Sequence, residues 1–462
     1  MAKKAKKASK AKKVKTSKGV RLEIVNPMAA GIDVSSTEMQ VCVPEHCDGD
    51  NNRRFGTFTE DLRYISEWLK ACGITTVAME ATGVYRVQLF MTLQSAGFDV
   101  IMVNAKAIKN IGEEKTDEVD AEWIMLLHSY GLLKASFQPD NQARRIRTLS
   151  RHRDNLLRSS SREVLHMQKA MELMNIKLAN VISDILGKSG MEIINAIIDG
   201  ERNPETLSLL ADPRCKASKE IIQKSLEANW DEDLVFMLKQ SYDLYLFYQQ
   251  QMSDCDKQIA QIAKEYLAEI DVAGVAGLKK LIRSNKKKSK KNAVTIDVEQ
   301  IAFQMWHVNL MLIPGISYTA MLRLIGELGH DFTEKFESYK QFSRWCNLCP
   351  NNKISGGKLL SSKIPKRKNP VGLILRQAAN SLKSSKTPLG FYFRRMQAKD
   401  GYLGAIVATA NKLARIIYTL VKTKTEYNDS YNKITEEEIL KKKLIIAQRA
   451  LERIQNQLMK TA

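Results

Sequence analysis

The sequence predicts an α/β plus α architecture, with one α/β domain followed by a longer helical part. Short apolar strands alternate with amphipathic helices between residues 20 and 135, a pattern typical of helices packed on a sheet. From residue 141 the strand pattern stops, and apolar residues recur at helical spacing instead. The length of 462 residues exceeds what one hydrophobic core usually holds, so several domains are expected.

The first domain, residues 20–135, begins with a predicted meander. The segments EIVNPMAAGIDVSSTEMQVCVP and FGTF favour short strands joined by turns, and a helix is expected over 59–72. The near-continuous apolar run ITTVAMEA predicts a buried strand. A helix over 85–96, a strand at DVIMVNA and a helix over 117–133 complete the alternation.

The rest of the chain divides by composition. Residues 1–19 are lysine-rich and of low complexity, which predicts a disordered arm. Residues 141–273 predict long helices in an antiparallel hairpin or coiled-coil arm. The basic insert and linker at 274–309 fits a solvated loop as well as a phosphate-binding one. Residues 310–425 predict a compact α-rich domain, and 426–462 one further amphipathic helix.

The charge balance indicates a polyanionic partner. The chain carries 72 basic and 51 acidic residues, a net charge of +21, and basic residues that neutralise phosphates release condensed counterions. A solvated basic surface is the alternative. No run approaches the ~18 apolar residues of a membrane span, and no apolar stretch follows the N-terminal lysines as in a secretory signal. Neither a membrane partner nor export is expected.

Four acidic residues of the first domain suit metal chemistry. Asp33 lies within the apolar strand GIDV, and Glu80 ends the strand VAME, where a buried charge needs compensation. Asp117 and Asp120 stand three apart at the start of a predicted helix and so share a face, although either could simply cap that helix. Carboxylate oxygens suit Mg²⁺, and two such ions can stabilise both oxygens of a phosphoryl displacement.

The segment LMLIPGISYTAMLRLIGELG predicts two helices joined at Pro314 and Gly315 and closing at Gly329. A helix-hairpin-helix of this kind would offer backbone N–H groups near Gly315 to a DNA phosphate. An ordinary helical turn fits the pattern nearly as well, because the turn lacks a second glycine.

Ser355 precedes Gly356 and Gly357, which would let the backbone approach a ligand closely. A serine placed there could attack a phosphodiester, but Ser-Gly-Gly is also common in ordinary loops, and no His/Asp partners for a triad are evident. Several basic side chains that follow could hold a phosphate backbone, namely Lys358, Lys363, Lys366, Arg367, Lys368 and Arg376.

Asp33, Glu80, Asp117 and Asp120, within GIDVS, AMEATGVY and KTDEVDAEWI, resemble the RuvC-like domain of DEDD insertion-sequence transposases, also called bridge-RNA-guided recombinases. The C-terminal PGI, SGGK and AIVATANKLARIIYTL segments resemble the transposase domain that accompanies it. The resemblance implies an RNase H-like (RuvC-like) fold, four acids that bind catalytic metals, and a covalent link between Ser355 and DNA.

This resemblance implies a transposase that cuts and rejoins DNA. The acids would hold two Mg²⁺ ions while Ser355 attacks, and a hydroxyl of a second strand would resolve the phosphoserine. The implied partners are DNA at element ends and target, a structured noncoding guide RNA, and further copies of the chain in a dimer or tetramer. A cytoplasmic, bacterial nucleoid-associated location follows. A RuvC-like junction nuclease that uses water and a non-catalytic nucleic-acid scaffold remain alternatives.

Overall fold

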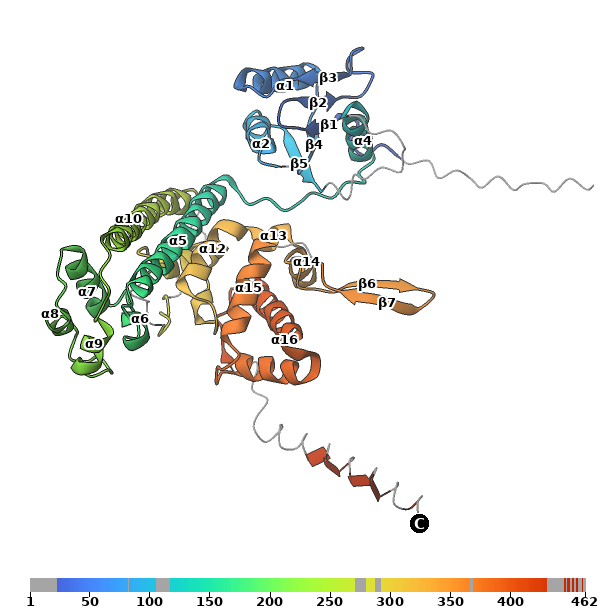
Figure 1. Ribbon diagram of the computed structural model, residues 1–462. Helices are drawn as coiled ribbons and strands as arrows, with labels where there is room; N and C mark the ends of the chain where they lie inside the picture. Colours follow the sequence, from blue (N-terminus) through green and yellow to red (C-terminus); the bar gives the residue numbers. More distant parts are fainter. Residues whose placement is uncertain are drawn as a thin grey trace, which may run out of the picture. The chain divides into compact units, whose positions relative to one another are not determined.

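The computed structural model in Figure 1 describes residues 23–81, 83–104, 117–270, 280–286, 292–365, 369–429 and scattered positions between 444 and 459. The predicted arm at 1–19 lies outside the described residues, as do most of the predicted C-terminal helix and the centre of the lysine-rich insert. The chain divides into two compact units, Met1–Gln138 and Pro139–Ala462.

The first unit is a five-stranded mixed sheet with helices on both faces, which confirms the predicted α/β fold. Strand order is β3-β2-β1-β4-β5, with β1 antiparallel to β2 but parallel to β4. The strands are β1 (Ala29–Val34), β2 (Met39–Cys42), β3 (Asn52–Phe55), β4 (Thr76–Glu80) and β5 (Asp99–Val103). The helices are α1 (Thr59–Ala71), α2 (Arg86–Ser95) and α4 (Asp117–Ser129).

The two faces of this sheet bury different helices, because successive strand residues point to opposite sides. Ile32 and Met79 belong to the core formed with α1 and α2. Ala78 and Val103 instead pack against Ile124 of α4. Figure 1 shows α4 across the sheet from α1 and α2. The residues on either side of Ile32 and Met79 therefore face α4.

The second unit begins with two long antiparallel helices, α5 (Asn141–Leu173) and α10 (Glu232–Glu269). Arg145 near the start of α5 pairs with Glu265 near the end of α10. Four shorter helices connect them and form a separate apolar core at the far end. These are α6 (Leu178–Val181), α7 (Lys188–Ile198), α8 (Pro204–Leu209) and α9 (Lys219–Ser225).

Among its described residues, the remaining part of the second unit is helical except for one hairpin. Its helices are α11 (Val298–Trp306), the 3₁₀ helix η2 (Leu310–Leu312), α12 (Tyr318–Leu328), α13 (Phe332–Lys335), α14 (Tyr339–Trp345), α15 (Pro370–Ser381) and α16 (Pro388–Thr423). The hairpin strands are β6 (Asn351–Ser355) and β7 (Lys358–Lys363).

A close crossing of α5 and α12 holds this unit together. A Cβ at Gly326 of α12 would lie 2.7 Å from the backbone nitrogen of Arg147, so glycine permits the contact. The adjacent Glu327 is buried and forms ion pairs with Arg147 and Arg151 of α5. The helices predicted as an arm thus pack directly on those of the C-terminal domain.

Helix α16 is long and apolar enough, by length and composition, to cross a membrane, yet half of its apolar window is buried inside the fold. A buried core helix passes the same criterion. Gly401, with φ 75° and ψ 176°, also interrupts its helical geometry. We therefore regard α16 as a core helix.

Candidate active site

Asp33 and Glu80 lie at the carboxyl ends of neighbouring parallel strands of the first unit, Asp33 one residue before the end of β1 and Glu80 at the end of β4. The register pairs Ile32 of β1 with Met79 of β4, and the two acids are the next residue on each strand. Ile32 and Met79 point toward α1 and α2, so Asp33 and Glu80 point to the opposite face. Both side chains are half-buried.

Helix α4 brings a third acid to the same end of the sheet. Near its C-terminus, the His128 ring lies 2.8 Å from the hydroxyl of Thr76, the first residue of β4. The helix therefore runs opposite to β1 and β4, and its first turn lies over their carboxyl ends. Asp120 lies in that first turn, beside the buried Ala121. Burial lowers the pKa of His128, so this anchor is neutral near pH 7.

Gly31 sets how closely α4 approaches the sheet. A Cβ at this position would lie 2.2 Å from the backbone nitrogen of Met125 and 2.3 Å from the carbonyl oxygen of Ala121. Only a residue without a side chain allows this approach. The structure thus brings Asp33, Glu80 and Asp120 to one end and one face of the sheet; Asp117 begins α4, but its side chain lies outside the described residues.

The donor set at this end fits a hard divalent cation. Carboxylate oxygens are the ligands that Mg²⁺ prefers. Gln40 lies opposite Asp33 in the antiparallel pair and is buried. Its Nε2 donates to Asn52 Oδ1, whereas its Oε1 has no hydrogen-bond partner within the described residues. A further buried oxygen acceptor therefore belongs to the residue opposite Asp33.

Ser355 lies at the tip of the exposed β6–β7 hairpin of the second unit, which Figure 1 shows extending away from α14. It pairs with Lys358, and the two residues between them, Gly356 and Gly357, have φ values of 53° and 76°. Such a two-residue turn requires positive φ at both positions, which glycine adopts freely. Gly-Gly between two short runs is the sequence signal for such a hairpin.

The predicted basic residues fall in different surroundings. Lys358 and Lys363 are exposed on β7, whereas the side chain of Arg376 on α15 donates to the carbonyl of Asn347, 2.7 Å away. The run Lys366, Arg367 and Lys368 lies outside the described residues. Arg376 therefore helps to position the chain that leads into the hairpin.

The turn at Gly315 is packed into the fold. Gly315 has φ 90°, and a Cβ there would lie 2.8 Å from the carbonyl oxygen of Ala378 on α15. Only the short helix η2 precedes the turn, in place of the expected longer helix. Lys286 of the basic insert was not among the expected site residues, yet its Nζ donates to the carbonyls of Ile313 and Ile316. Burial lowers the pKa of Lys286 to about 8.

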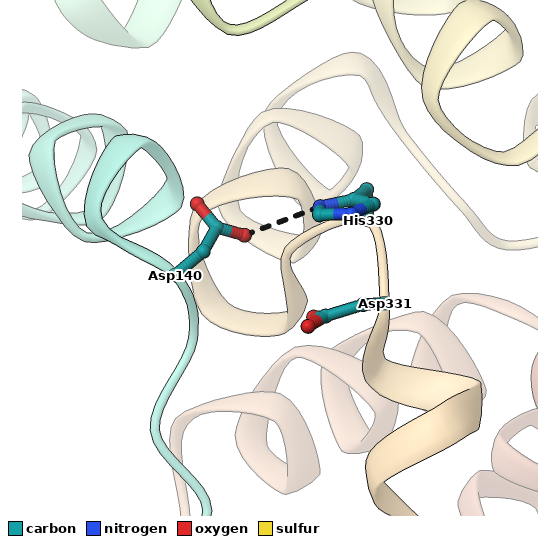
Figure 2. Close-up of side chains that lie close together, drawn as sticks. All are labelled: Asp140, His330 and Asp331. Carbon is teal, nitrogen blue, oxygen red and sulfur yellow. Dashed lines mark ion pairs between the residues drawn. The ribbon is translucent and has the colours of Figure 1, made fainter. Parts of the chain in front are cut away.

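A second cluster, in Figure 2, joins Asp140, His330 and Asp331 of the second unit. One carboxylate oxygen of each acid and one ring nitrogen lie within 4.8 Å of one another. His330 Nδ1 lies 3.4 Å from Asp140 Oδ2. Tyr266 donates its hydroxyl proton to Asp140 and accepts a hydrogen bond from the His330 backbone. A cavity of about 370 Å³ adjoins the group.

These contacts make the cluster a structural clamp. Asp140 also caps α5, accepting from the Ala143 N–H at 2.8 Å, and Asp331 pairs with Lys335 at 2.9 Å. The hydrogen bond with Asp140 raises the pKa of His330, against the effect of burial. Because the Asp140 carboxylate already contacts Tyr266, His330 and the Ala143 N–H, we interpret the group as a link between the start of α5, the end of α10 and the end of α12.

Comparison with known families gives two matches. A family model described as a transposase, for the DEDD domain of the IS110 type, matches residues 30–176 of the sequence. A second model, described as a transposase of the IS116/IS110/IS902 family, matches residues 307–390. No curated protein matches the chain. The first match includes the acids at the carboxyl ends of β1 and β4, and the second includes the β6–β7 hairpin.

Proposed function

Because the chain belongs to the IS110 family of DEDD transposases and is thus a DNA transposase, we propose that its catalytic groups are the acids of the first unit and Ser355 of the second. The acids are Asp33, Glu80, Asp117 and Asp120. The observation that carries this proposal is the placement of Asp33 and Glu80 on adjacent strand ends, on the face where α4 places Asp120.

The acids are the proposed ligands of Mg²⁺, and two such ions would supply charge stabilisation for the attacking and leaving oxygens of the phosphoryl group. Family membership supports a divalent metal in general. The carboxylates hold their position because α4 packs directly on Gly31 and because both strands are anchored in the buried sheet.

Ser355 is the proposed nucleophile. Its Oγ forms a bond to phosphorus while the bond from phosphorus to one DNA strand breaks, and the released strand hydroxyl takes up the serine proton. A hydroxyl of a second strand then attacks the phosphoserine, which joins the strands and regenerates Ser355. The exposure of the hairpin on both strands supports this role, because the serine can reach a large substrate.

The same proposal includes further copies of the chain and a structured noncoding RNA. The acids and Ser355 belong to different compact units, which is compatible with a serine that completes the acidic site of a neighbouring subunit. The net charge of +21 is compatible with binding both DNA and RNA.

The test incubates the protein with Mg²⁺, labelled element-end DNA and RNA transcribed from the flanks, and resolves covalent adducts on a denaturing gel. We expect a protein–DNA adduct that disappears in Ser355→Ala and in Asp120→Asn. Ser362→Ala, which changes an exposed serine on the opposite strand of the same hairpin, should keep the adduct. Cleavage without an adduct, unchanged in Ser355→Ala, would instead assign the chemistry to water.

A further inference from the structure

A groove of about 670 Å³ in the second unit is lined by residues that belong neither to the acidic site nor to the Ser355 hairpin. It is lined by residues of α14, of α16 and of the segment that follows α16. Three tyrosines line it, Tyr339, Tyr392 and Tyr427, together with Lys412 and Arg415. The groove therefore combines aromatic and basic side chains within one concave surface.

The tyrosine rings hold the cations in fixed positions. Lys412 Nζ lies 4.4 Å from the ring centroid of Tyr392, and the Arg415 guanidinium lies 4.6 Å from that of Tyr339. A third cation, Arg395, also lies over Tyr392, at 5.3 Å. Such cation–π contacts orient the charges before any ligand binds.

These cations lack anionic partners in the described part of the second unit. None of Lys412, Arg395 and Arg415 forms an ion pair with a carboxylate among the residues that the structure describes. Burial, together with the neighbouring Arg395 and Arg415, lowers the pKa of Lys412. Mutual repulsion of this kind is relieved when an anion binds between the charges.

Ile416 and Leu420 also line the groove, and they follow Lys412 at four-residue spacing on one face of α16, so apolar side chains adjoin the cations. A phosphate alone gains nothing from contact with apolar side chains, whereas a nucleotide offers both an anionic phosphate and a flat base. Clefts of ~300–1,000 Å³ take single small ligands, whereas a duplex presents its phosphates on a much broader surface. An unpaired nucleotide matches both the size and the chemistry.

We propose that this groove binds an unpaired nucleotide of the nucleic acid on which the transposase acts. The phosphate lies against Lys412 and Arg415, and the base lies against Ile416, Leu420 and the tyrosine edges. The proposal rests on the nucleic-acid substrate of the family and not on Ser355 or the acids of the first unit. Single-stranded DNA and single-stranded RNA share this chemistry, so the experiment separates them.

The test measures binding of labelled single-stranded DNA, single-stranded RNA and duplex DNA of one sequence to the full chain by fluorescence anisotropy. We expect the double variant Lys412→Gln/Arg415→Gln to bind at least one single strand ~10-fold more weakly. The slope of log affinity against log salt should fall by roughly 1.4, because each lost contact to a single strand contributes about 0.7. The single strand with the larger loss identifies the source of the nucleotide.

The matched control is Lys383→Gln/Lys399→Gln, which removes the same charge from two exposed lysines outside the groove lining. Equal losses in both double variants, or an equal loss for duplex and single strands, would show that the groove does not select an unpaired nucleotide. Tyr392→Leu removes aromatic contact without changing charge and should also weaken single-strand binding. If the groove variants alter only the proteolysis of residues 430–462, the groove holds the chain's own C-terminal segment and the proposal is wrong.

Discussion

At the scale of single residues, Gly31 controls the geometry of the acidic site. The atoms that a side chain would meet are backbone atoms of α4, which cannot move without shifting the whole helix. Asp120 belongs to that helix, whereas Asp33 and Glu80 belong to the sheet. The distances from Asp120 to the two acids of the sheet therefore depend on the absence of a side chain at Gly31.

We predict that Gly31→Ala lowers metal-dependent DNA cleavage at least ~10-fold and destabilises the protein by about 1–3 kcal/mol, the usual effect of overpacking. The measurements are cleavage of labelled DNA and chemical denaturation of the full chain. Gly49→Ala is the control, because a Cβ at Gly49 would meet nothing within 4 Å. Normal cleavage by Gly31→Ala would show that the position of α4 does not matter to catalysis.

At the scale of elements, α5 and α10 are joined by a fully buried ion pair. Arg153 Nε lies 2.7 Å from Asp256 Oδ1, and both side chains are almost completely buried. The Thr295 backbone N–H also donates to Asp256, at 2.9 Å, and Arg153 donates to the carbonyl of Ala293. The pair thus ties a third segment to the two helices.

Asp256→Asn should destabilise the second unit by about 3–5 kcal/mol, because it leaves a buried guanidinium without its counter-charge. Replacing both partners with apolar residues, as in Arg153→Met/Asp256→Leu, should cost less than the single change. Urea denaturation measures the free energy of unfolding of both variants. Asp254→Asn is the control, since Asp254 lies on the same helix in an exposed pair with Lys257 and should change stability little. A double variant that is less stable than Asp256→Asn would contradict this account.

The sequence predicted the α/β unit well because its signals are local. An acid within an apolar strand, as at Asp33, stands out from its neighbours, and the alternation of strands and helices fixes the architecture. The β6–β7 hairpin was not predicted, because its strands are short and exposed on both faces and so carry no apolar alternation.

Contacts between distant segments could not be predicted either. Asp140 and His330 are in contact but lie far apart in the sequence, and neither has an unusual sequence environment. The basic residues of the groove resemble an ordinary solvated helix face in sequence. Only the packing of α14 beside α16 places Tyr339 under Arg415.

At the scale of the whole molecule, stability should depend on pH through the clamp at His330. Its pKa is raised from the ordinary value of 6.5, mainly by the hydrogen bond with Asp140 and further by the charges of Asp331 and Glu334. A raised folded-state pKa means that the stabilisation is fully present below 6.5 and is lost as the pH rises through the folded value.

We therefore expect the free energy of unfolding to fall, through this histidine, as the pH rises from 6.5 through the raised pKa of His330. The buried His128 of the first unit has a lowered pKa and contributes in the opposite sense, so the comparison must be with His330→Gln. That variant should lose stability at pH 6 and differ less from the wild type at pH 8. A difference that is constant between these pH values would show that the clamp does not titrate.

The exposure of the β6–β7 hairpin affects when Ser355 can react with DNA. The Ser355 hydroxyl makes no hydrogen bond within the described part of the chain. A serine hydroxyl without a neighbouring base or metal is a weak nucleophile. On the proposed mechanism, Ser355 becomes reactive only when metal and DNA are bound beside it, so the free protein would not introduce stray breaks into the host genome.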